Sequence, residues 1–304
     1  MNIKSDTAKG YLFALVGTIA FSNEYIFSKA ALNEVHLTQF GVYWFLTGTI
    51  LTLLYSLYYK KLMRIKFLTK NQYFILVILG LLEIITATTF YLSIHIIPNP
   101  AVTSFLGNMF PVMLMLGGVT VLGEKFGPVE TAGVTLAITG AFIVSYTGEA
   151  SLKIFIPGAG IVLLNAFFAT TASLIIKVHV KNISPELLNL NRSLWLLLFS
   201  VIMLFIYRQP AAIPLSALKN IAIGAILGPF VAILTIYYSF RYIEASRSSI
   251  IQSLKGIFVL IGSFLFFGTL PLPHQILGGG ITIAGVMVMS LGRSGLLKIF
   301  NKKQ

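Results

Sequence analysis

The sequence contains no cysteine and a single aspartate, Asp6, among its 304 residues. Without cysteine there is no disulfide scaffold, no thiolate metal site and no cysteine nucleophile. Charged residues make up only 10% of the chain, whereas soluble domains average about 25%, so the charges are too few to cover a water-facing surface. Because 57% of the residues are hydrophobic and the mean hydropathy is +0.89, the composition predicts a protein whose main solvent is lipid.

The sequence also lacks the motifs of intramembrane enzymes. It has no His-Glu-x-x-His, no Gly-x-Ser-x-Gly and, with one aspartate, no aspartate pair. The four histidines are scattered and do not have the spacing of a metal site. We therefore expect no enzymatic activity, no cofactor and no bound metal.

Ten stretches are long and apolar enough for transmembrane helices, which need about 20 residues to cross a hydrocarbon core of roughly 30 Å. Their hydrophobicity is continuous and does not alternate as in a membrane β-barrel, so we predict an all-α polytopic membrane protein with ten transmembrane helices. The predicted stretches are 11–31, 40–58, 73–95, 100–122, 129–146, 157–177, 187–206, 218–240, 246–268 and 274–291.

The distribution of basic residues predicts how these helices are oriented. Lysine and arginine outnumber acidic residues by 22 to 9. With the N-terminus in the cytoplasm, 16 basic residues fall on the cytoplasmic side and only Lys29, Lys153, Arg208 and Lys219 fall outside. This asymmetry follows the positive-inside rule. It predicts insertion in the cytoplasmic (inner) membrane with both termini cytoplasmic, contact of the positive excess with membrane lipids, and no nucleic-acid binding.

Glycine, proline and serine positions of the first half of the sequence recur in the second half at an offset of 145 residues. The matching pairs are Gly117 and Gly262, Gly123 and Gly268, Pro128 and Pro273, Gly133 and Gly278, Gly140 and Gly285, and Ser145 and Ser290. A small shift in offset also aligns Lys29 with Lys177. We predict two halves, 1–148 and 149–304, each with five helices. An odd number of helices inverts one half relative to the other, as in many secondary transporters. A duplication retained only for packing is the alternative.

The motif near the end of the first half resembles that of the EamA-type branch of the drug/metabolite transporter superfamily. It consists of Pro111, the run Leu122-Gly123-Glu124-Lys125, Gly133 and Gly140. A second run, Ser239 to Leu254, is also similar to the family, whereas Gly256 and Thr269 depart from its proline and glutamate. The resemblance covers nearly the whole chain. It implies a ten-helix transporter with a central cavity lined by helices 1, 3, 4, 6, 8 and 9.

Two ionisable residues lie at matching depths in the predicted membrane. Glu83 is about 15 Å from the cytoplasmic end of its stretch and Lys255 about 13.5 Å from the same side. Ionisable groups at this depth cost at least about 2.5–3.5 kcal/mol each, so they usually face a cavity or a partner. We predict that Glu83 and Lys255 face one cavity and either pair or bind opposite ends of a zwitterion. A purely structural ion pair is the alternative.

Further polar residues are candidates for cargo binding. Tyr91 shares a helix face with Glu83, and Gln252 shares one with Lys255. Asn165 begins a stripe of small residues that fits either a cavity or close helix packing. Asn108 lies one turn before Pro111, where the missing backbone donor either exposes carbonyls to the cavity or kinks the helix.

Glu24 and its neighbour Asn23 lie nearer the outer side of the first stretch. Glu24 is a candidate proton-coupling site, because a buried carboxylate can exchange protons with the outside; pairing with Lys29 is the alternative. Arg192 is expected to anchor its helix at the inner interface, and Glu124 to pair with Lys125 or organise a loop.

These features favour a secondary transporter that exports a small metabolite by alternating access. Its cargo is expected to be amino-acid-like or amphipathic and drug-like, with protons as a possible coupling ion. A channel or lipid-handling protein of the same fold is the alternative. Because ten helices complete a cavity within one chain in this family, we expect a monomer.

Overall fold

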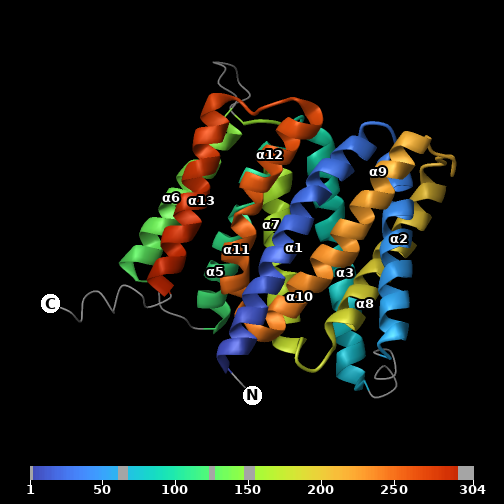
Figure 1. Ribbon diagram of the computed structural model, residues 1–304, viewed down its shortest axis with the longest axis horizontal. Helices are drawn as coiled ribbons and strands as arrows, with labels where there is room; N and C mark the ends of the chain where they lie inside the picture. Colours follow the sequence, from blue (N-terminus) through green and yellow to red (C-terminus); the bar gives the residue numbers. More distant parts are fainter. Residues whose placement is uncertain (1–2, 61–67, 123–126, 147–154, 294–304) are drawn as a thin grey trace.

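The computed structural model describes residues 3–60, 68–122, 127–146 and 155–293. Within these ranges the chain is helical, apart from connections and one isolated bridge between Tyr146 and Phe155, and the helices form a bundle (Figure 1). The elements are α1 (Ile3–Leu32), α2 (Leu37–Tyr58), α3 (Lys70–Ile96), α4 (Pro100–Leu106), α5 (Met109–Leu122), α6 (Pro128–Ser145), α7 (Ala159–His179), α8 (Pro185–Ile206), α9 (Leu215–Ala225), the π-helix η2 (Ile226–Ala232), α10 (Ile233–Tyr242), α11 (Ala245–Ser253), α12 (Lys255–Phe267) and α13 (Pro273–Arg293).

Eight helical segments of the described chain are long and apolar enough to cross a membrane, and Pro273–Met289 is a shorter apolar stretch. The prediction of an all-α membrane protein is therefore confirmed for the described ranges. α1 is 30 residues long but is not among the eight, because it carries more polar residues along its length. The count of ten crossings remains a prediction.

Three of the predicted stretches are interrupted. Gly107 and Asn108 separate α4 from α5, and Leu254 separates α11 from α12. The two breaks match between the halves, because Leu254 lies 146 residues after Asn108. Pro111 lies in the first turn of α5, where its missing donor costs nothing, so the helix breaks ahead of it. The third interruption is η2, where Pro229 lies inside the helix and the wider π turn accommodates it.

The helices α6 and α13 pack together through four glycines (Figure 1). A Cβ on Gly133 would meet the Gly285 carbonyl, and one on Gly278 would meet the Gly140 carbonyl. The two helices run antiparallel, because the residue numbers of the contacting glycines rise along α6 as they fall along α13. Backbone contact of this kind requires small residues. The glycines that matched between the halves of the sequence thus face one another in space.

The helix α1 runs antiparallel to the segment from α9 to α10. Gly10 lies against Ile243, Gly17 against Thr235, and Glu24 against Gly228. The start of α1 therefore lies beside the end of α10. The end of α1 lies at the opposite end of the bundle, near α9.

Two lysines cap helix ends on these opposite faces. Lys29 of α1 donates hydrogen bonds to the carbonyls of Ile94, His95 and Ile97 at the end of α3, at 2.9, 3.0 and 3.0 Å. Lys177 of α7 donates to the carbonyls of Phe240 and Ile243 at the end of α10, at 2.7 and 2.6 Å. An ammonium group satisfies carbonyls that a helix end leaves free and opposes its negative dipole. We call these the Lys29 end and the Lys177 end of the molecule.

Candidate functional site

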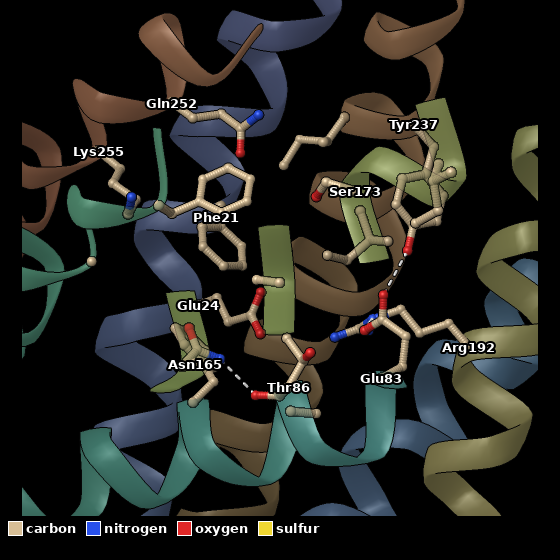
Figure 2. A pocket seen from close by; sticks show the side chains of 18 of the residues that line it. Phe21, Glu24, Glu83, Thr86, Asn165, Ser173, Arg192, Tyr237, Gln252 and Lys255 are labelled. Atoms are coloured by element: carbon tan, nitrogen blue, oxygen red, sulfur yellow. Dashed lines mark hydrogen bonds and ion pairs between the residues drawn. The ribbon is translucent and has the colours of Figure 1, made fainter. Parts of the chain in front are cut away.

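A polar cavity of about 120 Å³ lies inside the bundle. Its lining comes from α1, α3, α5, α7, α8, α10, α11 and α12, together with Gly107 at the interruption of α4 and α5. Of the predicted site residues, it brings together Glu24, Glu83, Asn165, Gln252 and Lys255. Figure 2 shows Gln252 and Lys255 on one side and Glu83 with Arg192 on the other, with Glu24 between them in this view.

Glu83 forms a buried ion pair with Arg192. The Arg192 Nε and Glu83 Oε2 atoms are 2.8 Å apart, and Tyr237 donates a hydrogen bond to Glu83 Oε1 at 3.2 Å. Glu83 and Lys255 do line one cavity, but the alternative that they pair with each other is wrong in this structure; binding of opposite ends of a zwitterion stays a prediction. The interfacial role expected for Arg192 is also wrong, because the residue is only 6% exposed. The guanidinium reaches the cavity because α8 packs against α3 and begins at Pro185, two turns before Arg192.

Glu24 has a partner on one carboxylate oxygen only. Tyr91 donates a hydrogen bond to Oε1, while Oε2 is buried and accepts no hydrogen bond in the described structure. The alternative of a Glu24–Lys29 pair is excluded in this structure, because Lys29 caps α3. Space for the carboxylate depends on Gly228, where a Cβ would lie 2.6 Å from Oε2.

Lys255 lies at the start of α12 and is 4% exposed. Its Nζ donates one long hydrogen bond, 3.4 Å, to Oδ1 of Asn108. Among the described residues it makes no ion pair. Gln252, three residues earlier, donates to Ser248 at 3.2 Å and lines the same wall.

Asn165 serves both of the roles that the sequence left open. Its Nδ2 donates to the Thr86 carbonyl at 2.7 Å, which ties α7 to α3, and its side chain lines the cavity (Figure 2). Ala169 and Ser173 continue the predicted stripe along the same wall. The sequence indicated this wall through the i, i+4 spacing of Asn165, Ala169 and Ser173.

Three predicted site residues do not line the cavity. Asn23 turns away and donates to the Ile19 carbonyl of its own helix at 2.9 Å, so it does not contribute to this cavity. Asn108 is fully buried behind Lys255, and Tyr91 is buried behind Glu24. Glu124 and Lys125 lie outside the described residues.

A second cavity, of about 370 Å³, lies between α2, α3 and α8. Tyr91 and Ala87 line it, and Ala87 also lines the polar cavity, so these residues form part of the wall between the two. His36 and His95 line it toward the Lys29 end. Among the described residues no cluster of histidine, aspartate or glutamate could hold a metal ion.

Comparison with known proteins gives two findings. The chain matches the model of the EamA-like transporter family twice, over residues 8–146 and 156–291. A solved structure described only as "Crystal structure of protein" is similar in fold, with a TM-score of 0.70 and 14% identity over 93% of this chain and 97% of that one. No curated protein matches the sequence.

Proposed function

The chain belongs to the EamA-like transporter family, and from this premise we propose that it is a secondary transporter that exports a small metabolite by alternating access. The supporting observation is a cavity inside the bundle that holds Glu24 and Lys255, neither of which forms an ion pair among the described residues. Leaving buried charges unpaired costs stability, so sites of this kind are retained for a ligand.

The cargo is proposed to be small and amino-acid-like. The cavity of about 120 Å³ is well below the roughly 300–1,000 Å³ of sites for drug-sized ligands, which favours a small metabolite over an amphipathic drug. Because Arg192 neutralises Glu83, the charges left for cargo are the anionic Glu24 and the cationic Lys255. Aromatic side chains, including Phe21, Phe90 and Phe110, supply an apolar wall for the rest of the molecule.

The proposed transport cycle rests on two inverted halves. We propose ten crossings in two five-helix repeats, 1–148 and 149–304, with both termini in the cytoplasm and one chain as the working unit. The antiparallel glycine contacts of α6 and α13 support the inversion. Rocking of one half against the other would expose the cavity first at the Lys177 end and then at the Lys29 end.

The cavity in this structure lies toward the Lys177 end. Ile176 and Phe240 line it, and both are next to atoms of the Lys177 cap. Toward the Lys29 end it is covered by the larger of the two hydrophobic clusters, which includes Phe90, Tyr91 and Val102. We assign this arrangement to the state that takes up cargo from the cytoplasm.

Glu24 is proposed to couple transport to protons. Its neighbours are neutral Tyr91 on α3 and Arg192 on α8, which is already paired with Glu83. A proton or a cationic cargo group would satisfy the free Oε2 oxygen, and competition between them would couple the two.

The experiment is flux of radiolabelled amino acids into and out of proteoliposomes, measured over a range of pH. We expect saturable flux with counterflow, and Glu24→Gln should flatten its pH dependence. Ser173→Ala, which alters a neutral residue of the same cavity, is the matched control. Flux without saturation or counterflow would support a channel, and lipid scrambling without cargo would support lipid handling; either result would contradict the transporter.

A further inference from the structure

Lys255 is a buried cation that the described protein leaves without an anion. The residue is 4% exposed, and its single hydrogen bond, to Asn108 Oδ1, is 3.4 Å long. An ammonium group has three donors, and in a low-dielectric setting each unmet donor is costly. The charge at this position therefore needs a partner that is not part of the described chain.

Asn108 supplies a second unmet donor at the same place. Its side chain is fully buried, and its Nδ2 has no hydrogen-bond partner in the described structure. Because its Oδ1 is turned toward Lys255, the amide and the ammonium group lie next to each other. Buried donors without acceptors are rare, which points to an acceptor that binds here.

The two donors come from opposite halves and from the interruptions in two helices. Asn108 lies between α4 and α5, and Lys255 directly follows the break between α11 and α12. Gly107 and Lys255 both line the cavity, so Lys255 is open to cargo, whereas Asn108 lies behind it. Discontinuous helices at a repeat interface are typical places for ligand groups in transporters.

The other charges of the cavity do not meet this requirement. Glu83 on α3 is paired with Arg192 on α8, and Glu24 on α1 is held by Tyr91. The residues that face the cavity from α7 and α10, such as Ser173 and Tyr237, are neutral. Lys255 and its neighbours can thus compensate one negative charge.

We propose that Lys255, positioned by Asn108, forms a subsite for the carboxylate group of the cargo. This inference rests on the proposed function, because it places cargo in the polar cavity. One ammonium group balances one carboxylate, whereas a phosphate monoester carries about −1.5 to −2 charges and would leave charge uncompensated. The carboxylate oxygens accept hydrogen bonds from Lys255 Nζ, which Asn108 Oδ1 holds from behind, and the remainder of the cargo lies toward Phe21 and Glu24.

The test is a thermal-shift and calorimetric titration of the purified full chain with matched pairs of ligands. Each pair consists of an amino acid or monocarboxylate and its carboxamide, such as leucine and leucinamide, benzoate and benzamide, or 4-methylpentanoate and its amide. We expect at least one carboxylate to bind on the order of tenfold to a hundredfold more tightly than its carboxamide. Lys255→Met should remove this preference, and Asn108→Ala should weaken it. Lys255→Arg should keep part of it.

The loss of carboxylate preference in Lys255→Met must be distinguished from misfolding and from a loss of transport. Thr171→Ala, on the same helix α7 but outside the cavity lining, and a matching helical circular-dichroism spectrum serve as controls for folding. The subsite would be overturned if wild type and Lys255→Met respond alike to every ligand pair, or if neither responds to any pair. Saturable flux that Lys255→Met leaves unchanged would also overturn the subsite but retain the transporter. Lys255-dependent carboxylate binding without flux would retain the subsite and contradict the proposed function.

Discussion

The Lys29 end and the Lys177 end have the same lysine cap on a helix end, in different surroundings. In each, a lysine of the first helix of one half caps the third helix of that half, and the accepting carbonyls of Ile94 and Ile97 correspond to those of Phe240 and Ile243. Around Lys29 the helices belong to the larger hydrophobic cluster and the second cavity reaches His95, whereas around Lys177 they belong to the smaller cluster and the polar cavity reaches Ile176 and Phe240. In the proposed cycle these two ends would act as the alternating gates.

The caps join helices within a half, whereas the contact between Glu83 and Arg192 joins the two halves. α3 belongs to the first half and α8 to the second. In the proposed cycle, a movement of one half against the other would strain this contact and the other helix contacts that join the halves, such as those of α1 with α10 and of α6 with α13. The comparison of the two ends therefore depends on this central ion pair.

The largest expected effect follows from breaking that pair. Glu83→Gln would leave the Arg192 guanidinium buried without a counter-charge, which costs about 3–5 kcal/mol of stability. We expect a lower thermal-unfolding temperature in lipid nanodiscs and strongly impaired flux. The double variant Glu83→Gln with Arg192→Met should recover stability but not flux. Wild-type flux in Glu83→Gln would remove Glu83 from the site.

A smaller effect distinguishes the two caps. Lys29→Met removes three charge-assisted hydrogen bonds and Lys177→Met removes two, so the two variants differ by one such bond, worth about 1.5–3 kcal/mol. We expect the first variant to unfold at the lower temperature and to open the Lys29 end more readily. Thermal unfolding of both variants in the same lipid measures the difference. Equal stability of wild type and both variants would show that the caps do not hold the helix ends.

The smallest effect compares two tyrosines that occupy matching positions. Tyr91 and Tyr237, 146 residues apart, each donate to a buried carboxylate, Glu24 and Glu83. Glu83 keeps Arg192 when Tyr237→Phe removes the hydroxyl, whereas Tyr91→Phe leaves Glu24 without a partner. Tyr91→Phe should therefore shift the pH profile of flux more than Tyr237→Phe. Identical profiles for the two variants would contradict the assigned role of Tyr91.

The helices and the repeat could be predicted from the sequence because they follow from local patterns. Continuous apolar stretches marked the helices, and the matched glycines marked faces that now pack between α6 and α13. Proline at position 111 indicated the interruption before α5. The π turn around Pro229 was missed, because the length of the stretch conceals it.

The partners within the cavity could not be predicted, because they depend on how helices face one another. Arg192 was placed by its position along the chain, yet its long side chain reaches Glu83 across the helix interface. Asn23 neighbours Glu24 in sequence but lies on another face of α1, where it bonds to its own backbone. The depth of a residue along its helix could be predicted, whereas the face of the helix toward which its side chain points could not.

Labelling of single cysteines tests the account most directly, since the chain contains no cysteine of its own. Ser173→Cys reports on the polar cavity and Val102→Cys on the cluster at the Lys29 end. A membrane-impermeant maleimide added at one face of oriented vesicles should reach Ser173→Cys quickly from the Lys177 face, while Val102→Cys reacts slowly and only from the Lys29 face. Rapid labelling of both positions from the same face would contradict the two alternating gates.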